Sequence, residues 1–362
     1  MSVRSGRVRS ARLTDLAAIG ELSRLSQDAA GTGPEADARP VRSLGLPVNA
    51  SQISVFSLFR MPLGAFQPHD PLYVFEDEGR LSGLARVDRD GHRDEWTIVE
   101  LDAVDHGDAG DIRFRLVQHL LRDGAKRGAE RFFVACSDTG GNVEIFMQAG
   151  FVRYGEENIL YRPPDVTWPA LPDAQQTAAA RIRPTVPMDA LQLHRLYQAV
   201  TPRPVTRLEG YRLPDWERQG NQWRIPRSAL TPILGFADVE AFVQECPPES
   251  APELAAFVQI GVAKEDQPHY LRVVSHAEHD PTDLIRYGLA AIGDRSGDAN
   301  RKRSASDQSR GRGVLTAVRT YESPIDRRLE EAGFNSIARV SLLMKETLVR
   351  VAEPALVPAT TR

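Results

Sequence analysis

Ionisable side chains gather at the end of a predicted strand near residue 100. Glu100 and Asp102 lie two residues apart, and His106 follows them. Side chains two positions apart on a strand share one face, so both carboxylates point to the same side. Carboxylate and imidazole groups commonly act as general acids and bases in enzymes. The shared face points either into a reaction cleft or into the solvent, and the residue types alone favour a solvent-exposed face.

A second ionisable group, His276, Glu278 and His279, lies at the end of the matching strand later in the chain. The spacing His-x-Glu-His could bind a metal ion or exchange protons. An Asp-Pro pair follows directly, which indicates a loop, and a third metal ligand would have to come from elsewhere. We therefore predict a polar loop and no metal site. Cys136 lies in an apolar run, which is typical of a buried core thiol.

The charge balance excludes a strongly basic protein. Lysine and arginine total 45 against 49 acidic residues, a net charge of −4, so no global basic field draws the chain to nucleic acid. A local basic patch, Arg301 to Arg303 with Arg310 and Arg312, is diluted by aspartates and holds no aromatic residue for base stacking. A solvated insertion is favoured, and no nucleic-acid partner is expected.

Cysteine use and hydropathy predict a cytoplasmic protein. The two cysteines, Cys136 and Cys246, fall in different halves of the chain, which excludes a disulfide framework and a cysteine-built zinc site. The basic N-terminus has no apolar stretch behind it, which argues against a signal peptide. No run approaches the roughly 20 apolar residues of a membrane span, so we expect no membrane partner.

The elements that must position these groups occur twice. The chain has 362 residues, 41% of them apolar, which is enough for two globular domains. Val8-Arg9 and Asp15 near the start return as Ile182-Arg183 and Asp189, at an offset of 174. Both stretches are typical of a short strand followed by an amphipathic helix.

The repeat returns at the other end of each copy. Ala149-Gly-Phe151 and Ala332-Gly-Phe334 are the same tripeptide, at an offset of 183. The difference between the offsets, 183 − 174 = 9 residues, fits into the Arg- and Ser-rich segment 294–312, which is predicted to be a surface loop. The ordered series of matches indicates a tandem repeat.

Strands and helices alternate in the same order between these ends. The first copy has predicted strands at 72–76, 81–87 and 96–104, a helix at 112–126, a strand at 132–136 and a short helix at 143–148. The second has predicted strands at 239–244, 254–262 and 270–275, a helix at 282–292, a strand at 314–318 and a short helix at 324–331. This order predicts α/β units around a mixed sheet in each copy.

A proline-rich stretch separates the copies. Four prolines in residues 163–180 disfavour helix and sheet and are typical of an extended spacer. We predict an N-terminal domain at 1–162, a linker at 163–180 and a C-terminal domain at 181–362. The copies pack together either by continuing their sheets or by facing helices.

The order of elements, with a helix followed by Ala-Gly-Phe, resembles the GNAT superfamily of acyl-CoA N-acyltransferases, in two tandem copies. The resemblance implies an α/β (α+β) fold in which each copy is a mixed, mostly antiparallel sheet with helices on both faces. It implies acetyl-CoA as the cofactor, with the pantetheine arm in a gap between the fourth and fifth strands. The pyrophosphate would lie at the start of the next helix, where backbone N–H groups and the dipole favour an anion.

Mapped onto the first copy, the resemblance places acetyl-CoA around the end of the fourth strand. The candidate cofactor-binding residues are Ala103, Val104, Gly107, Ala109, Gly110 and Arg113. Asp108 and Asp111 depart from the family pattern, because carboxylates beside a pyrophosphate repel it. The second copy has no glycine in the corresponding stretch, 279–284.

The resemblance also implies the reaction. It makes Glu100 and His106 the candidate catalytic residues, with Glu100 as a strand-borne general base for an amine. The tyrosine that usually protonates the departing thiolate is replaced by Phe146 and Leu329. We expect an N-acetyltransferase that moves an acetyl group from acetyl-CoA to a small-molecule or peptide amine, with the first copy as the better cofactor site. The alternative is a catalytically degenerate scaffold that binds a ligand or a protein partner.

Aromatic residues after the first helix of the second copy have two interpretations. Tyr211, Trp216 and Trp223 line either an acceptor pocket or the interface between the copies. The corresponding stretch of the first copy, residues 31–70, carries three phenylalanines with the same two interpretations. The identity of the acceptor and the oligomeric state stay open at this point.

Overall fold

The computed structural model of the chain describes residues 6–28, 71–90, 93–103, 109–138, 141–217, 226–247, 254–264, 267–297 and 312–347. Within these ranges the predicted strands and helices are confirmed, with ends that differ by a few residues. The basic patch at 301–303 with Arg310, Trp223 and the stretch 31–70 lie outside them.

Five strands of the first half stand side by side. They are β1 (Arg7–Ser10), β2 (Leu72–Asp77), β3 (Arg80–Asp90), β4 (Glu95–Ala103) and β5 (Arg131–Cys136). The first four pair antiparallel in chain order, and β5 runs parallel to β4. The sheet is therefore mixed and mostly antiparallel, as predicted.

The second half repeats this arrangement. Its strands are β7 (Ile182–Pro184), β8 (Phe236–Glu245), β9 (Leu254–Ala263), β10 (His269–Ser275) and β11 (Val314–Arg319). Antiparallel pairing joins β7 to β10 through β8 and β9, and β11 runs parallel to β10. Every residue of β9 and β10 is buried, because both faces of this part of the sheet are covered.

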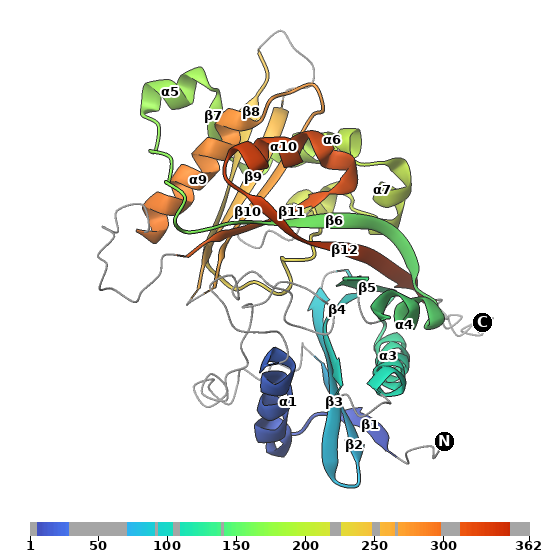
Figure 1. The fold of residues 1–362 in the computed structure, drawn as a ribbon. Coiled ribbons are helices and arrows are strands. Elements are labelled where there is room, and N and C mark those ends of the chain that lie inside the picture. Colours follow the sequence, from blue (N-terminus) through green and yellow to red (C-terminus); the bar gives the residue numbers. More distant parts are fainter. Residues whose placement is uncertain are drawn as a thin grey trace, which may run out of the picture.

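The last strands of the two halves are exchanged. The last strand of the second half, β12 (Asn335–Glu346), pairs with β5, and the last strand of the first half, β6 (Val152–Arg162), pairs with β11. The two strands also pair with each other (Figure 1). The result is one twelve-stranded sheet in the order β1-β2-β3-β4-β5-β12-β6-β11-β10-β9-β8-β7. The copies therefore join by a continuing sheet, while the predicted domain boundaries stay a prediction.

Helices cover both faces of the first half (Figure 1). α1 (Leu16–Asp28) packs Ile19 and Leu22 against Val74 and Leu84 of the sheet. α3 (Ala109–Lys126) and α4 (Asn142–Gln148) lie on the opposite face, over the larger core. Gly124 of α3 permits close packing, because a Cβ there would lie 2.5 Å from the Phe132 ring.

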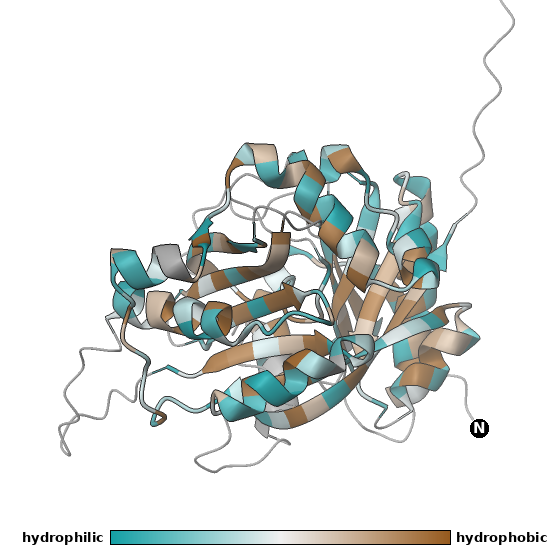
Figure 2. Cartoon of the chain, turned by 90° about the horizontal axis from the view of Figure 1, so that it is seen from above, coloured by the Kyte–Doolittle hydropathy of each residue, from teal (hydrophilic) through white to brown (hydrophobic). Residues whose placement is uncertain are grey.

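Two sets of helices cover the second half. On one face lie α6 (Ala190–Val200), α7 (Arg203–Glu209) and α8 (Leu213–Glu217), and on the other lie α9 (Thr282–Ser296) and α10 (Ser323–Glu331). Tyr211 and Trp216 belong to the core beneath α6. Figure 2 shows mostly hydrophobic strands inside and helices with mixed faces outside. Among the described helices, none has the length and apolarity to cross a membrane.

The two halves share a local ion-pair motif. In the first half the Arg9 guanidinium lies 2.6 Å from both Asp15 and Glu76, and Asp15 also accepts the N–H of Arg12 at 2.7 Å. In the second half the same contacts join Arg183, Asp189 and Glu245 at 2.6–2.7 Å. The repeated residues therefore hold the same turn, η1 (Leu13–Asp15) and η4 (Pro187–Asp189), at the start of each half.

The linker differs from the prediction of an extended spacer. A short helix, α5 (Ala174–Ala179), forms directly after the last of its prolines. Asp173 caps the helix, because its Oδ1 accepts the N–H of Gln176 at 2.7 Å while Gln176 Oε1 accepts the N–H of Asp173 at 3.1 Å. This reciprocal cap stabilises a helix start. The prolines therefore exclude a helix only over the first part of the linker.

Candidate active site

β4 and β5 are paired only at their beginnings. Parallel pairing joins Glu95–Ile98 to Arg131–Val134 and, within these two fully described strands, extends no further. A bulge at Val99 interrupts the pairing of β4 with β3 at the same level. The backbone of Val99–Ala103 therefore parts from β5, which continues along β12. We call this gap the first-half splay.

The two predicted carboxylates beside the splay are buried. Glu100 is 0% exposed and Asp102 is 4% exposed. Glu100 forms an ion pair with Arg86 of β3, with 3.0 Å between Oε2 and Nε. The expectation of a solvent-exposed face is therefore wrong. A cross-strand arginine offsets the cost of burying a carboxylate, and the local sequence pattern does not reveal that partner.

The predicted cofactor-binding residues follow the splay along the chain. Ala103 is the last residue of β4, and Ala109 and Gly110 begin α3. Outside the described residues lie Val104, His106 and Gly107. The roles assigned to all of these residues stay predictions.

The first turn of α3 leaves space beside its backbone. A Cβ built on Gly110 would have no atom of the described chain within 4 Å. The Asp111 side chain is 65% exposed, so water screens its charge. The first-turn N–H groups, which have no partner within the helix itself, and the positive end of the dipole of this 18-residue helix lie here. The geometry is compatible with an anion at this terminus.

Arg113, one turn into α3, contacts the neighbouring helix. Its Nη1 donates to Oδ1 of Asn142 at 2.7 Å, and Asn142 is buried at the first position of α4. The bond joins the beginnings of α3 and α4. The structure therefore places Arg113 between two helix N-termini, and its contact with a phosphate stays a prediction.

The second half has a corresponding splay, and a side chain fills it. β10 and β11 pair only at His269–Tyr270 with Val314–Leu315. Beyond that point the buried guanidinium of Arg272 donates to the carbonyl of Val273 in β10 at 2.9 Å and to that of Ala317 in β11 at 3.1 Å. Arg272 thus bridges the two strands where their own pairing has ended.

A carboxylate completes this bridge. Glu322 accepts two bonds from Arg272, both at 2.8 Å, and lies in the turn η6 (Thr320–Glu322) after β11. Bidentate pairs of this kind are strong and directional. Counted from the last paired residue of each strand, Arg272 takes the position that Glu100 has in β4. The two halves therefore carry opposite charges at one position.

The helix terminus of the second half also holds an anion. Oδ1 of Asp280 accepts the N–H of Thr282 at 3.1 Å and its hydroxyl at 2.6 Å, at the start of α9. The Thr282 hydroxyl, and then the nearby Arg328, lower the pKa of Asp280 below its usual value. A phosphate would meet this carboxylate at the terminus of α9.

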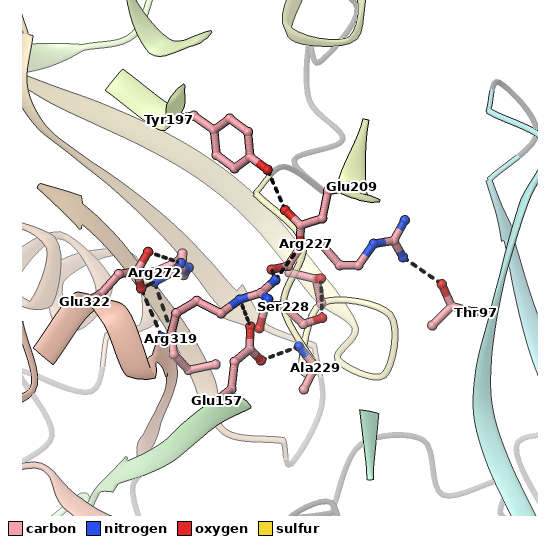
Figure 3. A network of polar contacts seen from close by, with 12 residues as sticks. Thr97, Glu157, Tyr197, Glu209, Arg227, Ser228, Ala229, Arg272, Arg319 and Glu322 are labelled. Atoms are coloured by element: carbon pink, nitrogen blue, oxygen red, sulfur yellow. Dashed lines mark hydrogen bonds and ion pairs between the residues drawn. The ribbon is translucent and has the colours of Figure 1, made fainter. Parts of the chain in front are cut away.

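Buried charges surround Arg319 of β11 (Figure 3). Its guanidinium lies 2.7 Å from Glu157 of β6 and 2.7 Å from Glu209 of α7. Glu209 in turn accepts the hydroxyl of Tyr197 at 2.7 Å. Burial raises the pKa of Glu157, which Arg319 opposes, and although burial lowers the pKa of Arg319, Glu209 and Glu157 raise it above its usual value. The cluster ties the exchanged strand β6 to the second half.

A segment of the second half, residues 226–234, crosses onto the first half. Arg227 donates to Oγ1 of Thr97 in β4 at 2.9 Å and forms an ion pair with Glu95. Its guanidinium lies 3.8 Å from the centre of the Phe133 ring in β5, a stacked cation–π contact. Figure 3 shows Arg227 reaching Thr97. Segment 226–234 therefore lies over the first-half splay at the level where β4 and β5 part.

A small hollow lies between this segment and the splay. Its lining includes Val99 of β4, Ala135 of β5, Tyr154 of β6, Leu342 of β12 and Ile233 of segment 226–234. Its volume is about 20 Å³. The hollow therefore has room for about one water molecule. Sequence reasoning did not find this wall, because it comes from the other half of the chain.

The position of the family tyrosine offers no hydroxyl. Phe146 is buried and packs edge-on against Phe151, with ring centres 5.3 Å apart, and Leu329 is buried in the second core. A different tyrosine, Tyr154, lines the hollow. Burial raises the pKa of Tyr154, so its hydroxyl stays protonated at neutral pH.

The remaining predicted groups lie apart from this site. His279 Nε2 is 3.0 Å from Oε1 of Gln244, and the described residues contain no cluster of three or more His, Cys, Asp or Glu side chains that could hold a metal ion. Cys136 is confirmed as a buried core thiol, and burial raises its pKa to about 12. Cys136 and His279 are not among the residues that line the hollow.

Solved structures of acetyltransferases share this arrangement. A tandem GNAT protein from the clavulanic acid biosynthesis pathway is 15% identical, with 94% of this chain and 98% of that chain covered and a TM-score of 0.51. A GCN5-related N-acetyltransferase from Sphaerobacter thermophilus is 14% identical, with 94% and 95% covered and a TM-score of 0.54. The chain has a tandem GNAT fold. The predicted fold class is confirmed.

The GNAT fold is what these similarities show. No protein-family profile and no curated protein matches the sequence. Another structure with the same fold, a glucosamine N-acetyltransferase region of a fungal multi-domain GH3 β-N-acetylglucosaminidase, is 11% identical and has a TM-score of 0.52, with 95% of this chain and 38% of that chain covered. In this GNAT fold, the two splays are the candidate sites.

Proposed function

We propose that the protein is an N-acetyltransferase that binds acetyl-CoA in its first half and moves the acetyl group to an amine. The contrast between the two splays carries the proposal. Arg272 bonds to backbone carbonyls of both strands of the second-half splay. In the first half the corresponding residue, Glu100, is paired with Arg86 of β3 instead. One of two similar sites is thus filled by the chain itself.

The first half supplies the groups that acetyl-CoA needs. The amides of a pantetheine arm can pair with a strand backbone, and Val99–Ala103 is the part of β4 that has left β5. The pyrophosphate would bind at the start of α3, with Ala109 and Gly110 presenting backbone N–H groups. Val104, Gly107 and Arg113 are further candidates around the same turn.

The transfer forms a nitrogen–carbon bond as the carbon–sulfur bond of the thioester breaks. We assign Glu100 as the general base for the amine, with His106 as its predicted neighbour. Tyr154 is our candidate to give a proton to the departing thiolate, because it lines the hollow beside Val99 and stays protonated at neutral pH. Backbone N–H groups of the parted strand would stabilise the oxyanion.

Calorimetric titration with acetyl-CoA tests the proposal. Gly110→Glu adds a carboxylate to the first turn of α3, where it suits the helix dipole but repels a pyrophosphate. We expect it to weaken binding by about tenfold or more. The matched variant Thr282→Glu makes the same change at the first turn of α9 and should leave binding unchanged.

Two results would contradict the proposal. Equal weakening by the two variants would remove the assignment of acetyl-CoA to the first half. No heat of binding at millimolar acetyl-CoA, with an unchanged far-ultraviolet spectrum, would leave the alternative, a non-catalytic scaffold that binds a ligand or a partner. Phe146 and Leu329, at the positions of the usual tyrosine, favour that alternative.

A further inference from the structure

We infer that the second half forms the acceptor-side wall of the first-half site, and that this wall admits a two-carbon acyl group in preference to longer ones. The inference rests on the proposed function and adds a structural role for the half whose own splay is filled. Segment 226–234 is the wall, Ile233 and Ala229 are its lining residues, and Arg227 positions it.

The wall lies at the level where the reaction would occur. The hollow beneath it is lined on the first-half side by Val99, the bulge residue of β4 in its pairing with β3, and by Val134 and Ala135. A thioester whose pantetheine arm follows Val99–Ala103 would present its acyl group here. With a volume of about 20 Å³, the hollow leaves no space for a long acyl chain unless the wall moves.

Arg227 fixes the wall to the first half. Its guanidinium contacts Glu95 and Thr97 of β4 and stacks on Phe133 of β5, so one side chain spans both strands just before they part. Glu95 is 1% exposed and is also paired with Arg93 at 2.9 Å. Loss of Arg227 would free the wall from the strands that carry the reaction.

The buried cluster around Arg319 fixes the other side of the wall. Arg319 Nη2 donates to the carbonyl of Arg227 at 2.7 Å, and Oε2 of Glu157 accepts the N–H of Ala229 at 2.7 Å (Figure 3). Both bonds hold the backbone of segment 226–234 rather than its side chains. The buried charges of Arg319 and Glu157 thus hold a loop over the first-half splay, which gives their costly burial a function.

A second hollow adjoins the first. It shares Thr97, Arg227, Ser228 and Pro232 with the first hollow and is further lined by Tyr211 and Asp88. Its volume is about 30 Å³. An amine that enters between β3 and segment 226–234 would therefore contact both halves before it reaches the acyl group.

A reactive analogue, bromoacetyl-CoA, tests where the acyl group lies without knowledge of the acceptor. In a chain carrying Cys136→Ala and Cys246→Ser, the variant Ile233→Cys places a thiol in the wall. The thiolate attacks the CH₂ carbon, a carbon–sulfur bond forms, the carbon–bromine bond breaks and bromide leaves, while the thiol proton goes to the buffer. Ala229→Cys is a second, smaller change in the same wall.

We expect both wall variants to gain one CoA adduct by mass, at least tenfold faster than Met188→Cys, whose position is 88% exposed and lies on the second half. Excess acetyl-CoA should slow the wall variants alone. Equal rates in all three variants, with acetyl-CoA still binding by calorimetry, would overturn the wall and leave the proposed function standing. No acetyl-CoA binding in the unmodified chain would overturn both.

Acyl selectivity gives the second readout. We expect Ile233→Ala to bind butyryl-CoA at least tenfold more tightly relative to acetyl-CoA than the unmodified chain does. A matched change in the second half, Ile292→Ala on α9, removes a similar buried side chain and should leave that ratio unchanged. A ratio that moves equally in both variants would overturn the assignment of Ile233 to the wall.

Discussion

The two halves of the molecule use one fold in opposite ways. In both, a parallel strand pair opens after its first residues, and a helix begins just beyond. In the second half, Arg272 enters the opening and Asp280 caps the helix. In the first half, Glu100 is paired with Arg86 of β3, and a Cβ on Gly110 would have no atom of the described residues within 4 Å. A few side chains, rather than the backbone, separate a filled site from a candidate site.

The comparison shows how a chain can keep a splay without a ligand. The parting strands leave backbone carbonyls that need donors, because unpaired buried polar groups are costly. Arg272 supplies those donors internally, and Glu322 balances its charge. In the proposed complex with acetyl-CoA, the pantetheine arm would supply similar donors to the first half from outside. The second half is therefore stable without a ligand, and its buried charges remain available to hold segment 226–234.

The largest expected effect comes from removing the centre of the buried cluster. Arg319→Met leaves Glu157 and Glu209 buried without their shared partner. We expect the free energy of unfolding in urea to fall by about 3–5 kcal/mol. Arg327→Met, which breaks an exposed pair with Glu331, should cost less than about 1 kcal/mol. Similar losses in the two variants would show that the cluster is not a stabilising centre.

The next effect concerns chemistry in the first half. Tyr154→Phe removes the proposed proton donor and keeps the ring. We expect kcat for thiol release with a panel of primary amines to fall by about 100-fold, while the Kd for acetyl-CoA stays the same. Tyr287→Phe, on α9 of the second half, keeps its ring contact with Phe242 and should change neither constant. An unchanged kcat in Tyr154→Phe would remove this assignment.

A smaller effect should be equal in the two halves. The hydrogen bond from Arg9 lowers the pKa of Asp15. The ion pair therefore stabilises the fold fully at a pH above the ordinary pKa of the carboxyl, and this contribution is lost as the pH falls through the lowered pKa. We expect Asp15→Asn to cost about 1–2 kcal/mol at pH 7 and progressively less as the pH falls below the ordinary pKa of the carboxyl. Asp189→Asn should behave alike, because Arg183 makes the same contacts. Unequal losses of unfolding free energy in the two variants would show that the two ion-pair motifs are not equivalent.

Local patterns were enough to predict the elements but not their partners. The sequence pattern agrees with the observed structure in three elements: the apolar runs form strands β5 and β11, and the amphipathic segment forms helix α3. The exchange of β6 and β12 could not be predicted, because either strand can pair with β5 or β11 without changing its own pattern. Strand periodicity fixes a face, and it does not fix a neighbour.

The candidate site shows the same division. Glu100 stood out by its type and place, yet its burial depends on Arg86, fourteen residues earlier on another strand. Arg227 carries no local signal at all, since its contacts with Thr97 and Glu95 cross about 130 residues of chain. The sequence therefore points to the first-half splay, and only the packed structure reveals the wall that the second half places over it.

The smallest expected effect is on the number of acetyl-CoA sites when the buried pair of the second half is removed. Arg272→Met alone leaves Glu322 buried and unpaired and should cost about 3 kcal/mol. The double variant Arg272→Met with Glu322→Gln removes both charges and keeps an acceptor for the N–H of Arg319, so it should recover part of that loss. It should not recover all of it, because the carbonyls of Val273 and Ala317 still lack the donors of Arg272. Acetyl-CoA should still bind at one site per chain, because Asp280 still occupies the terminus of α9. Two sites per chain by calorimetry would show instead that Arg272 alone keeps the second splay from binding, and that the halves differ by one side chain.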